Sequence, residues 1–235
     1  MENIIGIDIG GTTIKASLVF DKKPVSKIEV ETNANGSADS ILDPLFDQIN
    51  STWKGSFEAA GVGVPGYIDT EAGIIKVINN IPAFSGLNLK EKIEQKLGVP
   101  VKIENDANCF ILGEYFFGEA CMLNNVIGIT LGTGVGGGVI INRKVYSGMN
   151  GGAGEFGMIP FLDSNFEWYL GPNFFQHNYG KTGKEMYSDA ESGDKKALEA
   201  FRRYGQYLGD LLNLLMCAYS PEAFILGGSI TNAYK

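Results

Sequence analysis

The sequence contains few of the features that mark disulfide-rich, membrane-spanning or nucleic-acid-binding proteins. Its three cysteines, Cys109, Cys121 and Cys217, are odd in number and widely spaced, so they indicate neither a disulfide framework nor a zinc ribbon. The net charge of −8 argues against a broad nucleic-acid surface, which would be basic. The most apolar helical stretch, residues 208–219, includes an aspartate and is too short to span a bilayer. We therefore expect no nucleic-acid partner and no membrane partner.

A signal peptide and a low-complexity linker are also missing. The N-terminus has no basic region and its first apolar run is interrupted by Asp8, so we expect a cytoplasmic protein. With 44% hydrophobic and 20% charged residues, the chain of 235 residues has an ordinary globular composition. Its length allows one large domain or two small ones. We place a boundary near residues 121–125, which gives an N-terminal lobe of residues 1–121 and a C-terminal lobe of residues 122–235.

Two stretches of the chain share one pattern, Gly6-Ile-Asp-Ile-Gly-Gly-Thr-Thr13 and Gly128-Ile-Thr-Leu-Gly-Thr-Gly-Val135. Each begins as an apolar run, breaks into glycine and threonine, and resumes as a second apolar run, which predicts strand, tight turn and strand. Glycine lets backbone N–H groups approach an anion, and threonine hydroxyls add donors, so such a turn suits a phosphate. A single turn would be a weak signal. Two turns of the same order predict a duplicated domain that binds a nucleotide.

Strands and helices alternate along the rest of the chain. Apolar residues at helical spacing, such as Ile41, Leu45 and Ile49, mark the helices, and short apolar runs mark the strands. The further predicted strands are residues 25–32, 59–65, 73–79, 101–104 and 223–226, and the predicted helices are residues 38–53, 87–97, 106–117 and 197–219. This order predicts an α/β fold with mixed sheets.

Six motifs occur in the order seen in the ROK family of sugar kinases and repressors. They are Asp8-Ile-Gly-Gly-Thr-Thr-Ile-Lys15, Gly63-Val-Pro-Gly66, Glu104-Asn-Asp-Ala-Asn108, Leu131-Gly-Thr-Gly-Val-Gly-Gly-Gly138, Gly152-Ala-Gly-Glu-Phe-Gly157 and Leu226-Gly-Gly228. The sequence thus resembles this family over its whole length. The resemblance implies a duplicated ribonuclease-H-like ATPase fold of the actin, Hsp70 and hexokinase type, with two lobes and a cleft between them. It also implies transfer of the γ-phosphoryl group of MgATP to a hexose hydroxyl, usually O6.

Asp106 suits the proton acceptor that phosphoryl transfer to an alcohol requires. An aspartate before Ala-Asn-Cys-Phe is also a good helix N-cap, and by position alone the cap is the better interpretation. Asn105 beside it and the family motif around both favour catalysis, and one residue can do both. The resemblance then implies that Asn105 binds a sugar hydroxyl while Asp106 receives the proton from O6.

Asp8 is an acid within an apolar strand, next to the first glycine turn. A buried unpaired carboxylate is costly, so we expect it to have a partner. One alternative is a hydrogen bond to backbone amides of the turn. We favour a water-mediated contact to Mg²⁺ on ATP, because that ion prefers carboxylates, waters and phosphate oxygens.

The predicted phosphate contacts lie in the two glycine turns. Lys15, beyond the first turn, is the weakest candidate, since it is equally a solvated strand residue. A third turn, at the end of the strand over residues 223–226, is assigned to the adenosine. The predicted ATP-binding positions are Gly10, Gly11, Thr12, Thr13, Gly132, Thr133, Gly134, Gly227 and Gly228.

The sugar contacts are implied mainly by the resemblance, which assigns the backbone of Gly66 and the side chains of Asn80, Asn105, Glu155 and Glu167. Glu155 lies in a glycine-rich segment that offers no helical or strand face to solvate, so an ordinary surface role is less natural. Glu167 matches the family's glutamate at the start of a helix. An acid favoured there by the helix dipole alone is an equal alternative.

The sequence departs from the family at its zinc site. Most members have a histidine after Glu-x-Gly and then a Cys-x-Cys-Gly-x-x-Gly-Cys loop, which together bind structural zinc. Here the histidine position is Met158, and residues 159–166 contain no cysteine. The sole histidine, His177, lies among aromatic residues and is better read as a packing or surface residue than as a ligand. We expect no structural zinc, and the sugar preference is open because the family histidine also touches sugar.

The sequence thus predicts an ATP-dependent kinase of glucose or a related or N-acetylated hexose. The alternative is a sugar-binding sensor or regulatory pseudokinase. Family repressors carry an N-terminal winged helix, which does not fit a first strand at Asn3. Family kinases continue for a few helices after the last glycine turn, so we expect a C-terminal lobe that is truncated at its end. A homodimer is left open.

The zinc departure gives a direct test. Purified protein should contain zinc well below one ion per chain, and chelators should not unfold it, because no Cys/His set has tetrahedral spacing. Elemental analysis that finds one zinc per chain would show this prediction to be wrong.

Overall fold

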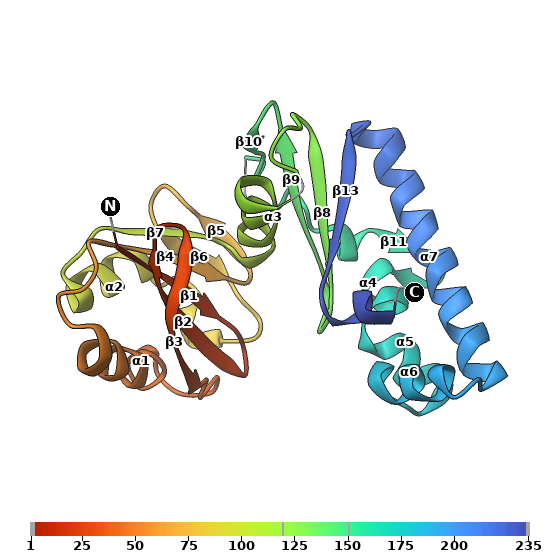
Figure 1. The fold of residues 1–235 in the computed structure, drawn as a ribbon, viewed down its shortest axis with the longest axis horizontal. Helices are drawn as coiled ribbons and strands as arrows, with labels where there is room; N and C mark the ends of the chain where they lie inside the picture. Colours follow the sequence, from red (N-terminus) through yellow and green to blue (C-terminus); the bar gives the residue numbers. More distant parts are fainter. Residues whose placement is uncertain (1–2, 119, 150, 234–235) are drawn as a thin grey trace. The chain divides into compact units, whose positions relative to one another are not determined.

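The computed structural model describes residues 3–118, 120–149 and 151–233. The chain divides into two compact units, each with its own sheet (Figure 1). The first unit comprises Met1–Cys109 with Met149–Gly151, and the second comprises Phe110–Gly148 with Gly152–Lys235. No helix within the described ranges is long and apolar enough to cross a membrane. The predicted lobe boundary after residue 121 stays a prediction.

The first unit contains a five-stranded mixed sheet of order β3-β2-β1-β4-β7. Its strands are β1 (Ile4–Ile9), β2 (Thr13–Phe20), β3 (Lys23–Glu31), β4 (Ala59–Val64) and β7 (Val101–Asn105). The predicted hairpin is confirmed, because β1 and β2 are antiparallel and Ile9 pairs with Ile14 directly beside the glycine turn. Strands β1, β4 and β7 run parallel, so their carboxyl ends meet at one edge of the sheet.

Two helices pack on this sheet and form the core of the first unit. α1 (Ala38–Trp53) and α2 (Leu89–Leu97) confirm the predicted helices. Ile41, Leu45 and Ile49 are fully buried, as their helical spacing predicts. A second hairpin of β5 (Tyr67–Asp69) and β6 (Ile74–Val77) follows β4. β5 was not predicted, because three residues are too few to show an alternating pattern.

The sheet of the second unit repeats the order of four neighbouring strands of the first, β3-β2-β1-β4. It has four strands in the order β10-β9-β8-β13. The strands are β8 (Val126–Leu131), β9 (Val135–Ile141), β10 (Lys144–Val145) and β13 (Ala223–Gly227). β8 pairs antiparallel with β9 and parallel with β13, as β1 pairs with β2 and β4. The predicted α/β fold with mixed sheets is therefore confirmed, and so are the two hairpins that indicated a duplication.

Five α-helices are found among the described residues from 106 onward. α3 (Asp106–Phe117) and α7 (Lys195–Tyr219) were predicted, whereas no helix was assigned between residues 170 and 191. The structure has α5 (Pro172–Tyr179) and α6 (Gly183–Glu191) there, both too short for a clear periodic signal, and α4 (Phe166–Leu170) is the helix near whose start the resemblance placed Glu167. Short segments complete this unit, namely the 3₁₀ helices Phe156–Met158 and Ser229–Ala233 and the strands β11 (Pro160–Phe161) and β12 (Ser164–Asn165). Aromatic side chains from α5 and α7 fill the core, and Phe175 stacks on Tyr204.

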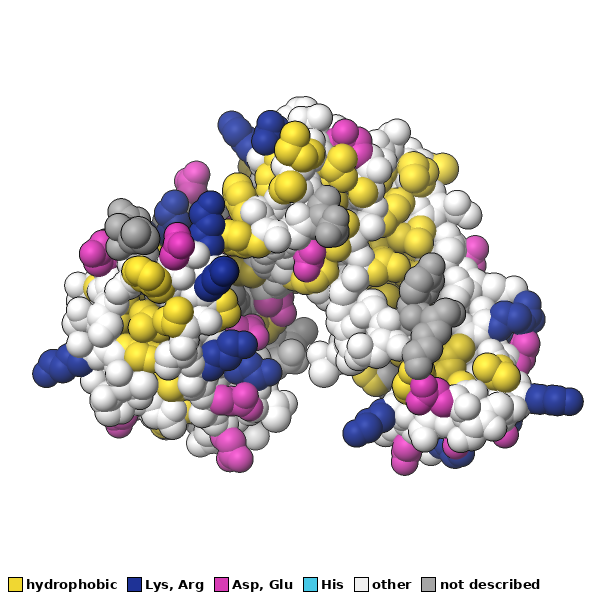
Figure 2. Space-filling view, in the orientation of Figure 1, with side chains coloured by type: hydrophobic (Ala, Val, Ile, Leu, Met, Phe, Trp, Pro, Cys, Tyr) yellow, Lys and Arg dark blue, Asp and Glu magenta, His cyan; other side chains and the backbone are white. Residues whose placement is uncertain are grey.

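Charged side chains are distributed over both units. On the face drawn in Figure 2, acidic and basic side chains are interspersed within each unit and do not gather into a patch of one sign.

A buried hydroxyl fixes the end of α4. Tyr204 donates to the carbonyl oxygen of Leu170 at 2.6 Å, and this carbonyl has no partner inside its own helix because Leu170 is the last residue of α4. Tyr204→Phe should lower the free energy of unfolding by about 1–3 kcal/mol, the cost of an unsatisfied buried acceptor. Tyr169→Phe is the matched control, because the Tyr169 hydroxyl bonds to Asp163 at the surface and should contribute little. Equal urea-unfolding midpoints for the two variants would contradict this assignment.

Candidate functional site

The carboxyl ends of β1, β4 and β7 bring together residues that lie far apart in the sequence. Asp8, Gly63 and Glu104 are direct neighbours across the three strands. At Gly63 a Cβ atom would lie 3.2 Å from the sulfur of Cys109 and 3.8 Å from the Cα of Asp106. The absence of a side chain at this position therefore lets the first turn of α3 sit close to β4.

Asn105, and not Asp106, caps α3. The Oδ1 atom of Asn105 accepts the N–H of Ala107 at 2.9 Å and that of Asn108 at 3.2 Å, which is the pattern of an N-cap side chain. Asp106 is the first helical residue. The interpretation of Asp106 as the cap is therefore wrong. β7 ends at Asn105 and α3 begins at the next residue, so the capping position is Asn105. Asp106 is left with an exposed side chain.

A polar layer beneath Asp106 holds this cap in place. Glu104 Oε1 accepts the backbone N–H of Asn105 at 2.9 Å and the side-chain amide of Asn108 at 3.0 Å. Asn108 is only 3% exposed. The amide of Asn105 in turn donates to the carbonyl of Gly66 at 3.3 Å, which ties the cap to the turn after β4. Both the oxygen and the nitrogen of the Asn105 amide are thus bound within the protein. This structural role was not predicted, since only a sugar contact was assigned to Asn105.

The pKa of the Asp106 carboxyl is raised above its ordinary value of 3.8. The largest cause is the surrounding protein, which removes water from the carboxylate although the residue keeps an exposed surface. The N–H of Ala107, which donates to Asp106 Oδ1 at 2.9 Å, acts in the opposite direction, and the negative charge of Asp8 raises the pKa further. A carboxyl with a raised pKa is a better proton acceptor once ionised.

Asp8 is exposed, which contradicts the expectation of a buried carboxylate in an apolar strand. β1 alternates, so Ile7 and Ile9 face the core and Asp8 points to the opposite face. Lys15, also exposed, is its direct neighbour on β2. Among the described residues no group of three or more His, Cys, Asp or Glu side chains could hold a metal ion. Mg²⁺ bound through nucleotide phosphates and waters needs only one such carboxylate, so Asp8 fits that predicted contact, which stays a prediction.

The first glycine turn is held by its own backbone and by the residue after β3. The N–H of Gly10 donates to the carbonyl of Thr13 at 2.9 Å. Thr32 donates through its hydroxyl to the carbonyl of Gly10 and through its N–H to that of Thr12, both at 2.8 Å. The predicted phosphate-binding turn therefore has a fixed shape.

The predicted sugar residues of the first unit lie beside this turn and beside the cap. Asn80 is exposed, and a Cβ atom on Gly11 would lie 3.2 Å from its Cβ, so Asn80 packs directly on the turn. Gly66 has a φ of +101°, a conformation in which glycine is favoured. The first unit thus brings together Asp8, Gly11, Gly66, Asn80, Asn105 and Asp106.

The second glycine turn lies against Glu167. The N–H of Gly132 donates to the carbonyl of Gly134 at 3.0 Å, and Glu167 Oε2 accepts the N–H of Val135 at 3.1 Å. Glu167 is half-buried in the first turn of α4, where the dipole also favours an acid. Glu155, likewise half-buried, precedes the 3₁₀ helix Phe156–Met158, whose Gly157 packs on the Cβ of Glu167. Both predicted glutamates therefore belong to the surroundings of this turn.

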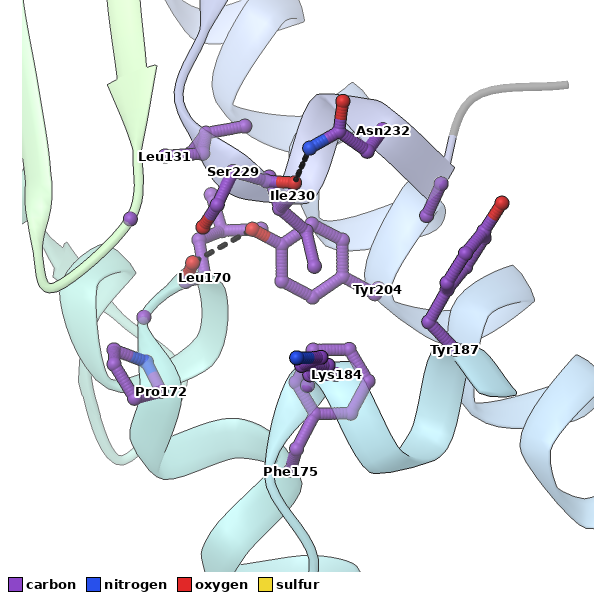
Figure 3. Close-up of a pocket in the computed structure, with 14 residues that line it drawn as sticks. Leu131, Leu170, Pro172, Phe175, Lys184, Tyr187, Tyr204, Ser229, Ile230 and Asn232 are labelled. Carbon is purple, nitrogen blue, oxygen red and sulfur yellow. Dashed lines mark hydrogen bonds between the residues drawn. The ribbon is translucent and has the colours of Figure 1, made fainter. Parts of the chain in front are cut away.

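A pocket of about 430 Å³ opens beside the second glycine turn (Figure 3). Gly132 is one of its lining residues, and the aromatic ring of Tyr204 lies between the Phe175 and Lys184 side chains and the 3₁₀ helix Ser229–Ala233. The predicted glycines at 227 and 228 immediately precede this helix. Gly228 has a φ of +94° and approaches the backbone of Leu131 too closely for any side chain.

The pocket residues of α5 and α6 were missed by the sequence analysis. They carry no motif, and their short helices were not predicted. Met158, at the position of the family's zinc-binding histidine, is 57% exposed, and His177 on α5, the sole histidine, is also exposed. The expectation of no structural zinc stays a prediction.

Comparisons with known proteins agree with this arrangement. A model of the ROK family matches residues 4–167 and 168–235. Glucokinase of Halalkalibacterium halodurans is 30% identical over 97% of this chain and 81% of its own length, and N-acetyl-D-glucosamine kinase of Pectobacterium atrosepticum is 32% identical over 97% and 84%. A ROK family glucokinase from Streptomyces griseus, solved in complex with glucose and AMPPNP, has a TM-score of 0.83 and 32% identity and covers 98% of this chain and 84% of that one. This match confirms the predicted duplicated ribonuclease-H-like ATPase fold.

The cap assignment can be tested by stability. Asn105→Ala should lower the free energy of unfolding by about 0.5–2 kcal/mol, whereas Asn105→Ser, which can still cap, should cost less. Asp106→Ala should be close to neutral, because the only helical N–H that Asp106 is seen to accept, that of Ala107, is also bound by Asn105. Urea unfolding in which Asp106→Ala is the more destabilised variant would return the cap to Asp106.

Proposed function

The chain belongs to the ROK family, and on that premise we propose that it is a carbohydrate kinase that phosphorylates a hexose with ATP. The observation that carries the proposal is the placement of Asp106, an exposed carboxylate of raised pKa beside Asp8 at the carboxyl ends of three parallel strands. The names of the relatives, glucokinase and N-acetyl-D-glucosamine kinase, support glucose or an N-acetylated hexose as the substrate.

In the proposed reaction, a sugar hydroxyl, O6 in the first instance, attacks the γ-phosphorus of ATP. A bond forms between this oxygen and phosphorus, the bond to the β,γ-bridging oxygen breaks, and ADP leaves. Asp106 takes the hydroxyl proton, which prevents a positive charge from building on the attacking oxygen. Because the carboxylate is exposed and lies outside the cap, it can reach a bound hydroxyl without breaking α3.

The sugar is held by groups from several segments. We assign the backbone of Gly66 and the side chains of Asn80, Asn105, Glu155 and Glu167 to its hydroxyls. Asn105 Oδ1 is bound to α3, so its contribution is one amide N–H, the other being donated to Gly66. Its main contribution is therefore to fix the position of Asp106.

The two glycine turns bind the phosphates of ATP, and the pocket beside Tyr204 holds the adenosine. Its volume of about 430 Å³ and its aromatic and apolar lining suit a nucleoside. Bound Mg²⁺ would neutralise charge on the phosphates, and Asp8 would contact it through water. Lys15, next to Asp8, would add a positive charge to the same edge of the sheet.

The proposal is tested by ADP release with glucose, N-acetylglucosamine and N-acetylmannosamine as acceptors. We expect turnover with at least one of them, and no turnover with any would favour a regulatory pseudokinase. In the same assay Asp106→Asn should reduce turnover roughly 10²- to 10⁴-fold, the usual contribution of a general base, with a much smaller change in sugar KM.

Asp47→Asn is the matched control, because Asp47 is an exposed carboxylate on α1 with no predicted contact to substrate. Asp106→Asn with turnover close to that of Asp47→Asn would place the base elsewhere.

A further inference from the structure

We propose that Glu167 is a positioning residue for the second glycine turn, and that it shapes this turn for the nucleotide before any sugar is bound. The inference rests on the proposed kinase function and adds a second duty to a residue assigned so far only to sugar. It concerns the second unit alone.

The contact is direct and lies beside a glycine. Glu167 Oε2 lies 3.1 Å from the backbone nitrogen of Val135. A Cβ atom on Gly134 would lie only 2.6 Å from the same oxygen, so a side chain at this position would displace the carboxylate. A methyl group at position 134 would therefore meet the end of the Glu167 side chain and move it away from the N–H of Val135.

The backbone and the Cβ atom of Glu167 are held by their neighbours. Asn165 caps α4 by accepting the N–H of Trp168 at 2.9 Å, and the carbonyl of Glu167 accepts the N–H of Gly171 at 2.7 Å. Gly157 approaches the Cβ of Glu167, where an added methyl carbon would lie at 3.2 Å. A carboxylate carried by a helix held in this way can restrain the turn, whose glycines allow many backbone conformations.

In the first unit, the corresponding glycine turn is held by a different residue. There, Thr32 follows the nine-residue strand β3 and bonds to both Gly10 and Thr12 of the first turn. The corresponding strand β10 has two residues, which pair with Ile140 and Ile141 at the far end of β9. It does not extend to the second turn. Glu167 supplies from α4 the support that Thr32 supplies from the end of β3.

The restraint determines which groups of the turn are left for an anion. The N–H of Gly132 bonds to Gly134 and that of Val135 bonds to Glu167. The N–H groups of Thr133 and Gly134 have no partner among the described residues, and Thr133 is exposed. These two N–H groups and the Thr133 hydroxyl form the donor set for a phosphate. Oε1 of Glu167 is not used in the contact with the turn, so a sugar contact remains compatible.

The test is calorimetric titration with MgAMPPNP in the absence of sugar. Glu167→Ala should weaken nucleotide binding by about tenfold, the effect of losing a charge-assisted hydrogen bond that shapes the site. Glu167→Gln, whose amide oxygen still accepts the N–H of Val135, should stay within about threefold of the unsubstituted protein. Circular dichroism of each variant checks that α4 and the fold are retained.

Gly134→Ala provides an independent perturbation of the same contact. It should weaken MgAMPPNP binding on its own, and its effect should shrink when Glu167→Ala removes the carboxylate that the added methyl group meets. Unchanged sugar-free MgAMPPNP binding by Glu167→Ala would overturn the inference and leave Glu167 as a sugar ligand only. Failure of the unsubstituted protein to bind MgAMPPNP would instead overturn the proposed function, and the inference with it.

Discussion

The cap that Asn105 places on α3 is the interaction on which the proposed catalytic geometry depends. β7 ends at Asn105, and its side chain closes the first turn of the helix. The next residue, Asp106, is thereby fixed at the start of α3 with its carboxylate exposed. Were Asp106 the cap, its carboxylate would also accept the N–H of the third helical residue, which Asn105 binds here, and this further bond would lower its pKa. Separate residues for capping and for proton transfer allow a rigid backbone and an available base.

The glycine turns of the two units are held by different contacts. Each half has a glycine-rich turn that is predicted to bind phosphate, and such a turn has no preferred shape of its own. In the first unit the neighbouring strand is long enough to hold the turn through Thr32. In the second unit the strand is short, and a carboxylate from α4 holds the turn. A duplicated fold therefore does not require duplicated contacts, and in the second unit the support comes from Glu167, a predicted sugar residue.

The sequence was sufficient to predict the hairpins and the longer helices, and it supplied a candidate base whose role stays a prediction. The hairpins were visible because Gly10-Gly11-Thr12 interrupts two apolar runs, and α1 because its buried residues recur at helical spacing. Asp106 was identified from the family motif around it. Local patterns of this kind depend on residues close in sequence, which is why they can be read without a structure.

The contacts that sequence reasoning missed are set by register or by long-range packing. Asn105 and Asp106 are equally good caps, and only the end of β7 decides between them. The exposure of Asp8 depends on which face of β1 meets the core. The bond from Glu167 to Val135 joins residues 32 positions apart. The pocket at Tyr204 is formed by short helices that carry no motif.

The most direct test of this account is the pKa of the Asp106 carboxyl, measured by carbon-detected NMR titration of the protein without ligands. The account predicts a pKa above the ordinary value of 3.8, because the surrounding protein and the charge of Asp8 both oppose ionisation. A pKa below 3.8 would contradict it, since that is the behaviour of a carboxylate bound to the N–H groups of a helix terminus.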